Sequence, residues 1–116
     1  MHATFVELPP FEKVRGNYLN DVAYLDLQNE LMANLQAGDV IEGTGGLRKL
    51  RQVDPRRGKG KRGCLRVMYR WWLGGGQFWF FTAYDKDQAD DLTPEQCKTL
   101  KRLLDRERQY RLPKGI

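Results

Sequence analysis

The sequence predicts one α+β domain, residues 1–116. A twisted antiparallel sheet of three to four strands is joined in it to an N-terminal edge strand, one or two helices and a C-terminal helix. Two observations predict the mixture: apolar residues recur with helical spacing early and late in the chain, whereas the middle is rich in strand-forming residues. The third observation is length, because 116 residues can bury one hydrophobic core but not two.

The composition is that of a folded protein, with 41% hydrophobic and 30% charged residues. No apolar run approaches the roughly 20 residues of a membrane span, and the N-terminus lacks a signal-peptide core. We therefore expect a cytoplasmic protein with no membrane partner. Cys64 and Cys97 lack CxxC spacing and His2 is the single histidine, so the sequence predicts no metal site, no disulfide framework and no cofactor.

The first elements are a short strand and a weak helix. Residues 4–8 are β-branched and apolar, and two prolines follow, Pro9 and Pro10. Because proline cannot donate to a sheet ladder, this run is expected to be an edge strand that ends in a turn. Residues 11–19 are weakly helical, and Gly16 is expected to interrupt them.

A stronger helix is predicted to begin at Asn20, whose side chain can accept a hydrogen bond from the first turn. Gly38 is expected to end this helix. The apolar stripe expected to face the core consists of Val22, Leu25, Leu31, Met32 and Leu35.

A glycine turn and a basic strand come next. The glycines within residues 43–46 lack the spacing of a phosphate-binding loop and predict a tight turn into a strand at residues 47–53. Alternation along this strand places Lys49 and Arg51 on one face and Arg48 on the other.

Residues 54–63 are expected to form a solvated loop, because a proline, three glycines and five cations cannot bury themselves. Residues 47–72 as a whole contain ten of the chain's 20 Lys and Arg, with Asp54 as the only acid. With a net charge of +5, this concentration favours a polyanionic partner such as nucleic acid. The cations of the loop are Arg56, Arg57, Lys59, Lys61 and Arg62.

Two aromatic strands, residues 64–73 and 77–85, predict a hairpin closed by three glycines. A three-residue loop pairs Leu73 with Gln77. The register then places Arg66 opposite Tyr84, Cys64 opposite Lys86, Met68 opposite Thr82 and Arg70 opposite Phe80.

This register separates an apolar face from a basic one, which a shift by one residue would mix. With helices covering the apolar face only, the basic face is expected to form a concave surface that can hold single-stranded nucleic acid. The apolar face consists of Leu65, Val67, Tyr69 and Trp71 against Trp79, Phe81 and Ala83. The basic face carries Arg66, Arg70, Tyr84 and Lys86.

The C-terminal helix has the clearest start in the sequence. Thr93 is predicted as its N-cap, Pro94 follows at the first helical position, and Gln96 completes a capping box. Residues 106–116 are basic and are expected to fray. The apolar stripe of this helix consists of Cys97, Leu100, Leu103 and Leu104.

The ordered combination of these segments resembles the RelE/ParE superfamily of toxins from bacterial type II toxin-antitoxin modules, closest to its HigB-type, RelE-like branch. The resemblance spans roughly residues 18–104. It is carried by the runs GTGGLRKLR, RGCLRVMYRWW and QFWFFTAYDKDQADDLTPEQCKTLKRLL, with the basic glycine loop between the first two.

The resemblance implies a metal-independent endoribonuclease that cleaves mRNA in the decoding site of the ribosome and is kept silent by a cognate antitoxin. In that family the RNA's own 2′-hydroxyl attacks the adjacent phosphate. By position in the matched motifs, Arg66 would bind the scissile phosphate and Lys86 would stabilise the transition state or act as an acid. Lys49 and Arg51 would position the backbone or help to deprotonate the 2′-hydroxyl.

Acid and base roles without a nearby histidine would fall to lysine or tyrosine, whose ordinary pKa near 10 neighbouring cations lower. Tyr84 is the candidate for proton transfer or for stacking on a base. Some relatives use a histidine or tyrosine beyond the last strand, where this chain has Asp91 and Leu92. Arg48, Arg70 and the loop cations are expected to grip the RNA backbone.

Two alternatives remain open at this point. One is a ParE-like toxin that poisons gyrase and has no nuclease chemistry. The other is a module that binds RNA or the ribosome with the same basic face and cleaves nothing.

Overall fold

The computed structural model describes residues 3–53, 64–72, 76–85 and 92–111. Their strands form one five-stranded sheet in the order β1-β5-β4-β3-β2. Strands β2 to β5 pair antiparallel in succession, and β1 adds to β5 in parallel at the edge. The strands are β1 (Thr4–Glu7), β2 (Asp39–Val40), β3 (Arg48–Val53), β4 (Cys64–Trp72) and β5 (Gln77–Asp85). This arrangement confirms the predicted α+β fold class, with an N-terminal edge strand beside a four-stranded antiparallel sheet.

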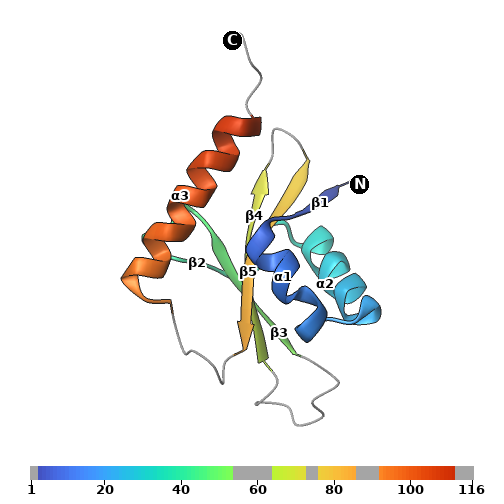
Figure 1. Cartoon of the computed structure of the whole chain (residues 1–116). Helices are drawn as coiled ribbons and strands as arrows, with labels where there is room; N and C mark the ends of the chain where they lie inside the picture. The colour runs from blue at the N-terminus through green and yellow to red at the C-terminus, as the bar shows by residue number, and fades with distance from the viewer. Residues whose placement is uncertain (1–2, 54–63, 73–75, 86–91, 112–116) are drawn as a thin grey trace.

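Three helices cover the sheet, and both faces are covered (Figure 1). The helices are α1 (Pro9–Tyr18), α2 (Asp21–Ala33) and α3 (Pro94–Arg111). On the α1 and α2 side the core is built around Phe11, Leu27, Leu31, Val67, Tyr69, Phe78 and Phe80. On the α3 side it is built around Leu47, Met68, Trp79, Phe81, Leu100 and Leu104. The expectation that one face of the sheet stays open and polar is therefore wrong.

A bulge in β5 explains this difference. Arg66 pairs with Tyr84 and Met68 with Thr82, as predicted, but Tyr69 pairs with Phe80 and Arg70 with Trp79. Phe81 is the extra residue, and it faces α3 with the same side of the sheet as Met68.

The shifted register also corrects the predicted faces. Trp72, not Leu73, pairs with Gln77. Trp79 and Phe81 consequently pack under α3, whereas Phe78 and Phe80 join Tyr69 on the other side. The pairing proposed for Cys64 with Lys86 lies outside the described residues.

The helix starts follow the capping residues of the sequence. The Asn20 side chain accepts a hydrogen bond from the Ala23 N–H at 2.8 Å, as predicted. At α3, the Thr93 hydroxyl accepts from the Gln96 N–H at 3.1 Å, and the Gln96 carbonyl oxygen accepts from the Thr93 N–H at 2.8 Å. The predicted capping box is thus confirmed.

Several boundaries differ from the expectation. Helix α1 begins at Pro9 and runs through Gly16 without a break, since proline at the first helical positions sacrifices no hydrogen bond. Helix α2 ends at Ala33, and Gly38 lies later, in the turn before β2 with φ +88°. An added Cβ at Gly38 would collide with the carbonyl oxygen of Lys49, so the close approach of the two backbones requires glycine.

The face that α2 buries is rotated from the predicted one. Ala23, Leu27 and Leu31 are buried, whereas Val22 is 69% exposed and Leu25 is 55% exposed. In α3 the predicted stripe is confirmed at Leu100 and Leu104, and the helix continues through residues 106–111 that were expected to fray. None of the helices within the described ranges is long and apolar enough to cross a bilayer.

Candidate active site

Several of the predicted site residues lie in two rows that run across β3, β4 and β5. The first row is Arg51, Arg66 and Tyr84, which are direct partners across the three strands. The second row contains Lys49, Met68 and Thr82 in the same way. Because directly paired residues project from the same face of a sheet, Lys49, Arg51, Arg66 and Tyr84 share one face. Met68 belongs to the core under α3, so this is the α3 face.

Arg66 is the most unusual side chain of this face. Its side chain lies on a central strand and is only 5% exposed. Two of its guanidinium nitrogens, Nε and Nη1, are buried and have no hydrogen-bond partner among the described residues. Its partner on β3 is a second arginine, Arg51, and like charges directly opposite each other destabilise a sheet. Two buried donors without an acceptor in the described residues and a like-charged neighbour both favour an anion at this position.

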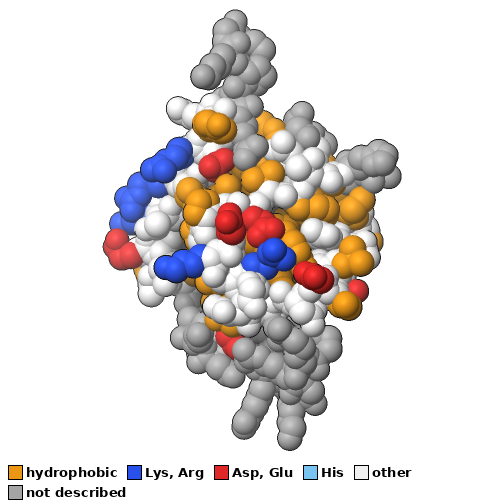
Figure 2. All heavy atoms as spheres, turned by 45° about the vertical axis from the view of Figure 1, so that its right-hand side comes forward, with side chains coloured by type: hydrophobic (Ala, Val, Ile, Leu, Met, Phe, Trp, Pro, Cys, Tyr) orange, Lys and Arg blue, Asp and Glu red, His pale blue; other side chains and the backbone are white. Residues whose placement is uncertain are grey.

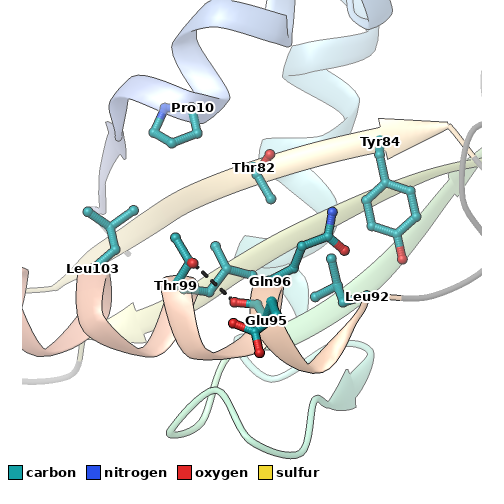
Figure 3. Close-up of a pocket in the computed structure, with 9 residues that line it drawn as sticks. Pro10, Thr82, Tyr84, Leu92, Glu95, Gln96, Thr99 and Leu103 are labelled. Atoms are coloured by element: carbon teal, nitrogen blue, oxygen red, sulfur yellow. Dashed lines mark hydrogen bonds between the residues drawn. The ribbon is translucent and has the colours of Figure 1, made fainter.

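Tyr84 joins the cationic row to a groove beneath the start of α3 (Figure 3). The groove has a volume of about 530 Å³ and lies between β5, the first turns of α3 and the start of α1. Its walls are mostly apolar, and Tyr84 forms one end of it in Figure 3. It is lined by Pro10, Thr82, Tyr84, Leu92, Glu95, Gln96, Thr99, Leu100 and Leu103.

The bulge brings Phe81 to the side of the sheet on which this groove lies. Without an extra residue in β5, Phe81 and Thr82 would project from opposite faces of the sheet. In the structure Phe81 packs under α3 and Thr82 lines the groove on the same side. The groove and its lining from Thr82, Leu92 and Gln96 were not predicted from the sequence, since neither the bulge nor the angle of α3 has a local sequence signal.

Arg48 lies on the opposite face of β3. Its guanidinium Nη1 donates to the carbonyl oxygens of Gln36 at 3.1 Å and Gly38 at 3.0 Å. These bonds tie the segment after α2 to β3. Arg48 is therefore not brought together with Arg66.

Arg70 lies four residues along β4 from Arg66, beside the glycine turn. Its Nη1 faces the carbonyl oxygens of Gly45 and Gly46 at 3.4 and 3.3 Å. Burial and the neighbouring Arg108 guanidinium lower the pKa of Arg70. Arg70 and Arg48 also line a smaller cavity of about 150 Å³, which is separate from the groove at Tyr84.

The remaining predicted residues, Lys86 and the loop cations Arg56, Arg57, Lys59, Lys61 and Arg62, lie outside the described residues. A feature that the sequence reading did not assign is the outer face of α3. Figure 2 shows Lys and Arg side chains along the margin that this helix forms. The exposed cations of α3 include Lys98, Lys101, Arg102 and Arg106. The described part of the chain contains no cluster of three or more His, Cys, Asp or Glu that could hold a metal ion.

Comparison with known proteins identifies the fold. The sequence matches no protein-family model. Among solved structures, the chain is similar to the Escherichia coli toxin RelE, determined in the free state as a variant with two arginines replaced by alanine. The TM-score is 0.53 at 10% sequence identity, and the alignment covers 78% of this chain and 90% of the RelE chain. The chain therefore has a RelE-like fold.

Proposed function

We propose that this chain is the toxin of a bacterial type II toxin-antitoxin module, of the HigB-type branch, and that it cleaves mRNA as a ribosome-dependent endoribonuclease. The fold supports the proposal, because its solved neighbour is a toxin. The observation that carries it is Arg66, a buried guanidinium with two unpartnered nitrogens beside a second arginine. A phosphodiester is the anion that a RelE-like surface with this charge pattern would bind.

In the proposed reaction the ribose 2′-hydroxyl attacks the adjacent phosphorus. The O2′–P bond forms and the P–O5′ bond breaks, which leaves a 2′,3′-cyclic phosphate and a 5′-hydroxyl. Negative charge grows on the non-bridging oxygens in the transition state, and Arg66 and Arg51 would stabilise it through N–H donors that need no reorganisation. No cofactor or metal takes part in this scheme.

Proton transfer is assigned to the lysines and the tyrosine around Arg66. Lys49, half-buried beside Arg51 on the same face, would orient the 2′-hydroxyl or accept its proton. Lys86 would donate a proton to the leaving 5′-oxygen, and Tyr84 would share this role or stack on a base. The loop cations at residues 54–63 would grip flanking phosphates.

Arg48 and Arg70 would contribute mainly long-range attraction, because both guanidinium groups already face backbone carbonyls. The partners of the proposed toxin are mRNA, the decoding site of the ribosome and a cognate antitoxin in the bacterial cytoplasm. These partners follow from the family resemblance of the sequence.

The test is to express the chain, map mRNA 5′ ends in cells, and repeat the mapping with Arg66→Ala. We expect new ends with the wild type and at least a hundredfold fewer with the variant, the usual effect of removing one transition-state donor. Lys13→Ala, an exposed cation on α1, is the matched control and should cleave like the wild type.

Purified components refine the same test. Cleavage should require ribosomes and stop when the attacking nucleotide carries 2′-deoxyribose. Gyrase-dependent DNA breaks without new mRNA ends would instead identify a ParE-like toxin. Binding to ribosomes without any cleavage would identify a non-catalytic module.

A further inference from the structure

We infer that the groove beside Tyr84 is a nucleobase site, and that Gln96 selects a base that presents hydrogen-bond acceptors. The inference rests on the proposed function, because it takes the occupant to be a nucleotide of the RNA whose phosphate is bound at Arg66. It assigns a base-selecting role to the start of α3.

The occupant of the groove is inferred from its position beside the row of Arg51, Arg66 and Tyr84. Tyr84 is the direct cross-strand partner of Arg66 and also lines the groove. Adjacent strands are about 4.8 Å apart, so a phosphate at Arg66 lies within one nucleotide of the Tyr84 ring. A base attached to that phosphate can reach the groove without leaving the surface of the sheet.

The walls fit an aromatic base. Leu92, Leu100 and Leu103 provide apolar contact, and the Tyr84 ring provides a surface for stacking. The volume of about 530 Å³ lies within the range of pockets that enclose small organic ligands.

The capping box fixes which atoms of Gln96 are available. The Gln96 carbonyl oxygen Oε1 is held by the Thr93 N–H at 2.8 Å, so the amide cannot flip without losing this bond. Figure 3 shows the amide nitrogen Nε2 directed toward the sheet, between Thr82 and Tyr84. Gln96 therefore presents N–H donors to the groove.

The other polar groups of the groove offer few competing acceptors. The Thr99 hydroxyl donates to the Glu95 carbonyl at 3.0 Å within the helix. The Glu95 carboxylate turns away from the sheet in Figure 3. A mostly apolar groove with the Gln96 amide N–H as its polar contact favours a base edge with acceptors, such as O6 and N7 of guanine, over an edge with an amino group.

The sharpest test is Gln96→Glu. Glutamate is the alternative residue at this position of a capping box, so it still accepts from the Thr93 N–H and preserves the start of α3. It replaces the donor nitrogen with a carboxylate oxygen. The ratio of cleavage at the preferred base to cleavage at the other bases should fall about tenfold. Gln109→Glu makes the same charge change at an exposed position of the same helix and should leave this ratio unchanged.

Binding measurements separate this inference from the proposed function. Short oligodeoxynucleotides cannot be cleaved by 2′-attack because they lack the 2′-hydroxyl, and one base in them can be varied among A, C, G and U. Wild-type protein should prefer the acceptor-bearing base in competition assays, and Gln96→Glu should lose that preference. Leu103→Trp, which fills the groove, should lose it as well while retaining phosphate-dependent binding.

Two results have different meanings. Cleavage that depends on Arg66, with a base preference that Gln96→Glu and Leu103→Trp leave intact, would overturn the base site and keep the nuclease. In that case the groove would be a binding site for an apolar segment of another protein. No cleavage by wild type, with the base preference present in binding and lost in Gln96→Glu, would overturn the nuclease and keep the base site.

Discussion

The two faces of the sheet are organised differently although the same strands build both. On the α1 and α2 side, aromatic rings fill the interface and carry their own polar contacts: the Tyr69 hydroxyl donates to the Ala37 carbonyl at 2.6 Å. On the α3 side, apolar packing stops at Met68, and Arg66 follows with unpartnered nitrogens. The two faces differ in charge: a buried arginine with two unpartnered nitrogens lies on the α3 side, where an anion can bind, and the α1 and α2 side is built mainly of aromatic and aliphatic packing.

Arg48 and Arg66 differ in the same way, in the hydrogen-bond partners of their guanidinium groups. Both were expected to contact RNA, and both lie in the middle layer of the domain. Arg48 donates to two backbone carbonyls, whereas Arg66 Nε and Nη1 have no acceptor in the part of the chain that the structure describes. Only Arg66 is placed where an anionic ligand would complete its hydrogen bonds.

The largest expected effect on stability comes from removing a buried aromatic ring on the α1 and α2 side of the sheet. Phe80 is fully buried and stacks on Phe11 with ring centroids 4.8 Å apart. Phe80→Ala should lower the free energy of unfolding by about 3–5 kcal/mol, measured by urea denaturation. Val22→Ala on the exposed side of α2 should change it by less than about 0.5 kcal/mol. Equal losses in both variants would show that the core does not lie where the structure puts it.

Replacing the Arg66 guanidinium should raise the free energy of unfolding instead of lowering it. Arg66→Met keeps the aliphatic volume and removes a buried guanidinium with two nitrogens that lack a partner among the described residues, so the variant should be more stable than wild type by about 1–3 kcal/mol at low salt. Added phosphate should stabilise the wild type and not the variant, which thermal unfolding at constant ionic strength can measure. A variant less stable than the wild type in phosphate-free buffer would contradict an unpaired Arg66.

A loss of stability at high pH is expected from Tyr69, which lies on the α1 and α2 side of the sheet. Burial raises the pKa of Tyr69 to about 12, so above pH 10 the folded state binds more protons than the unfolded state. The free energy of unfolding should therefore be constant below pH 10 and fall between pH 10 and pH 12. Tyr69→Phe should cost about 1 kcal/mol at pH 7 through the lost hydrogen bond. It should also make the alkaline slope shallower, and Tyr24, whose pKa burial also raises, keeps the rest of that slope. An unchanged slope would mean that Tyr69 is not the titrating group.

The smallest change in stability and in cleavage is expected from replacing Arg48. Arg48→Met loses the bonds to the carbonyls of Gln36 and Gly38 and should lower the free energy of unfolding by about 1 kcal/mol. Cleavage by the folded variant should fall far less than with Arg66→Ala. A loss of cleavage as large as that of Arg66→Ala would move the site to the other face.

The sequence by itself determined the features that depend on neighbours in the chain. Asn20, Thr93 and Gln96 cap helices through bonds that span three residues, so their roles could be predicted. The pairing of Arg66 with Tyr84 was predicted correctly because two errors cancel: Trp72, not Leu73, pairs with Gln77, and the bulge at Phe81 restores the one-residue difference.

Only the tertiary structure decided the rest. The bulge at Phe81 depends on packing against α3, and it turned Trp79 and Phe81 to the face that was expected to be open. The rotation of α2, which buries Leu27 and exposes Val22 and Leu25, depends on where α1 and the sheet leave room. The groove beside Tyr84 arises between elements far apart in the chain. Its occupant is proposed from contacts that no sequence pattern encodes, because packing between distant elements has no local signature.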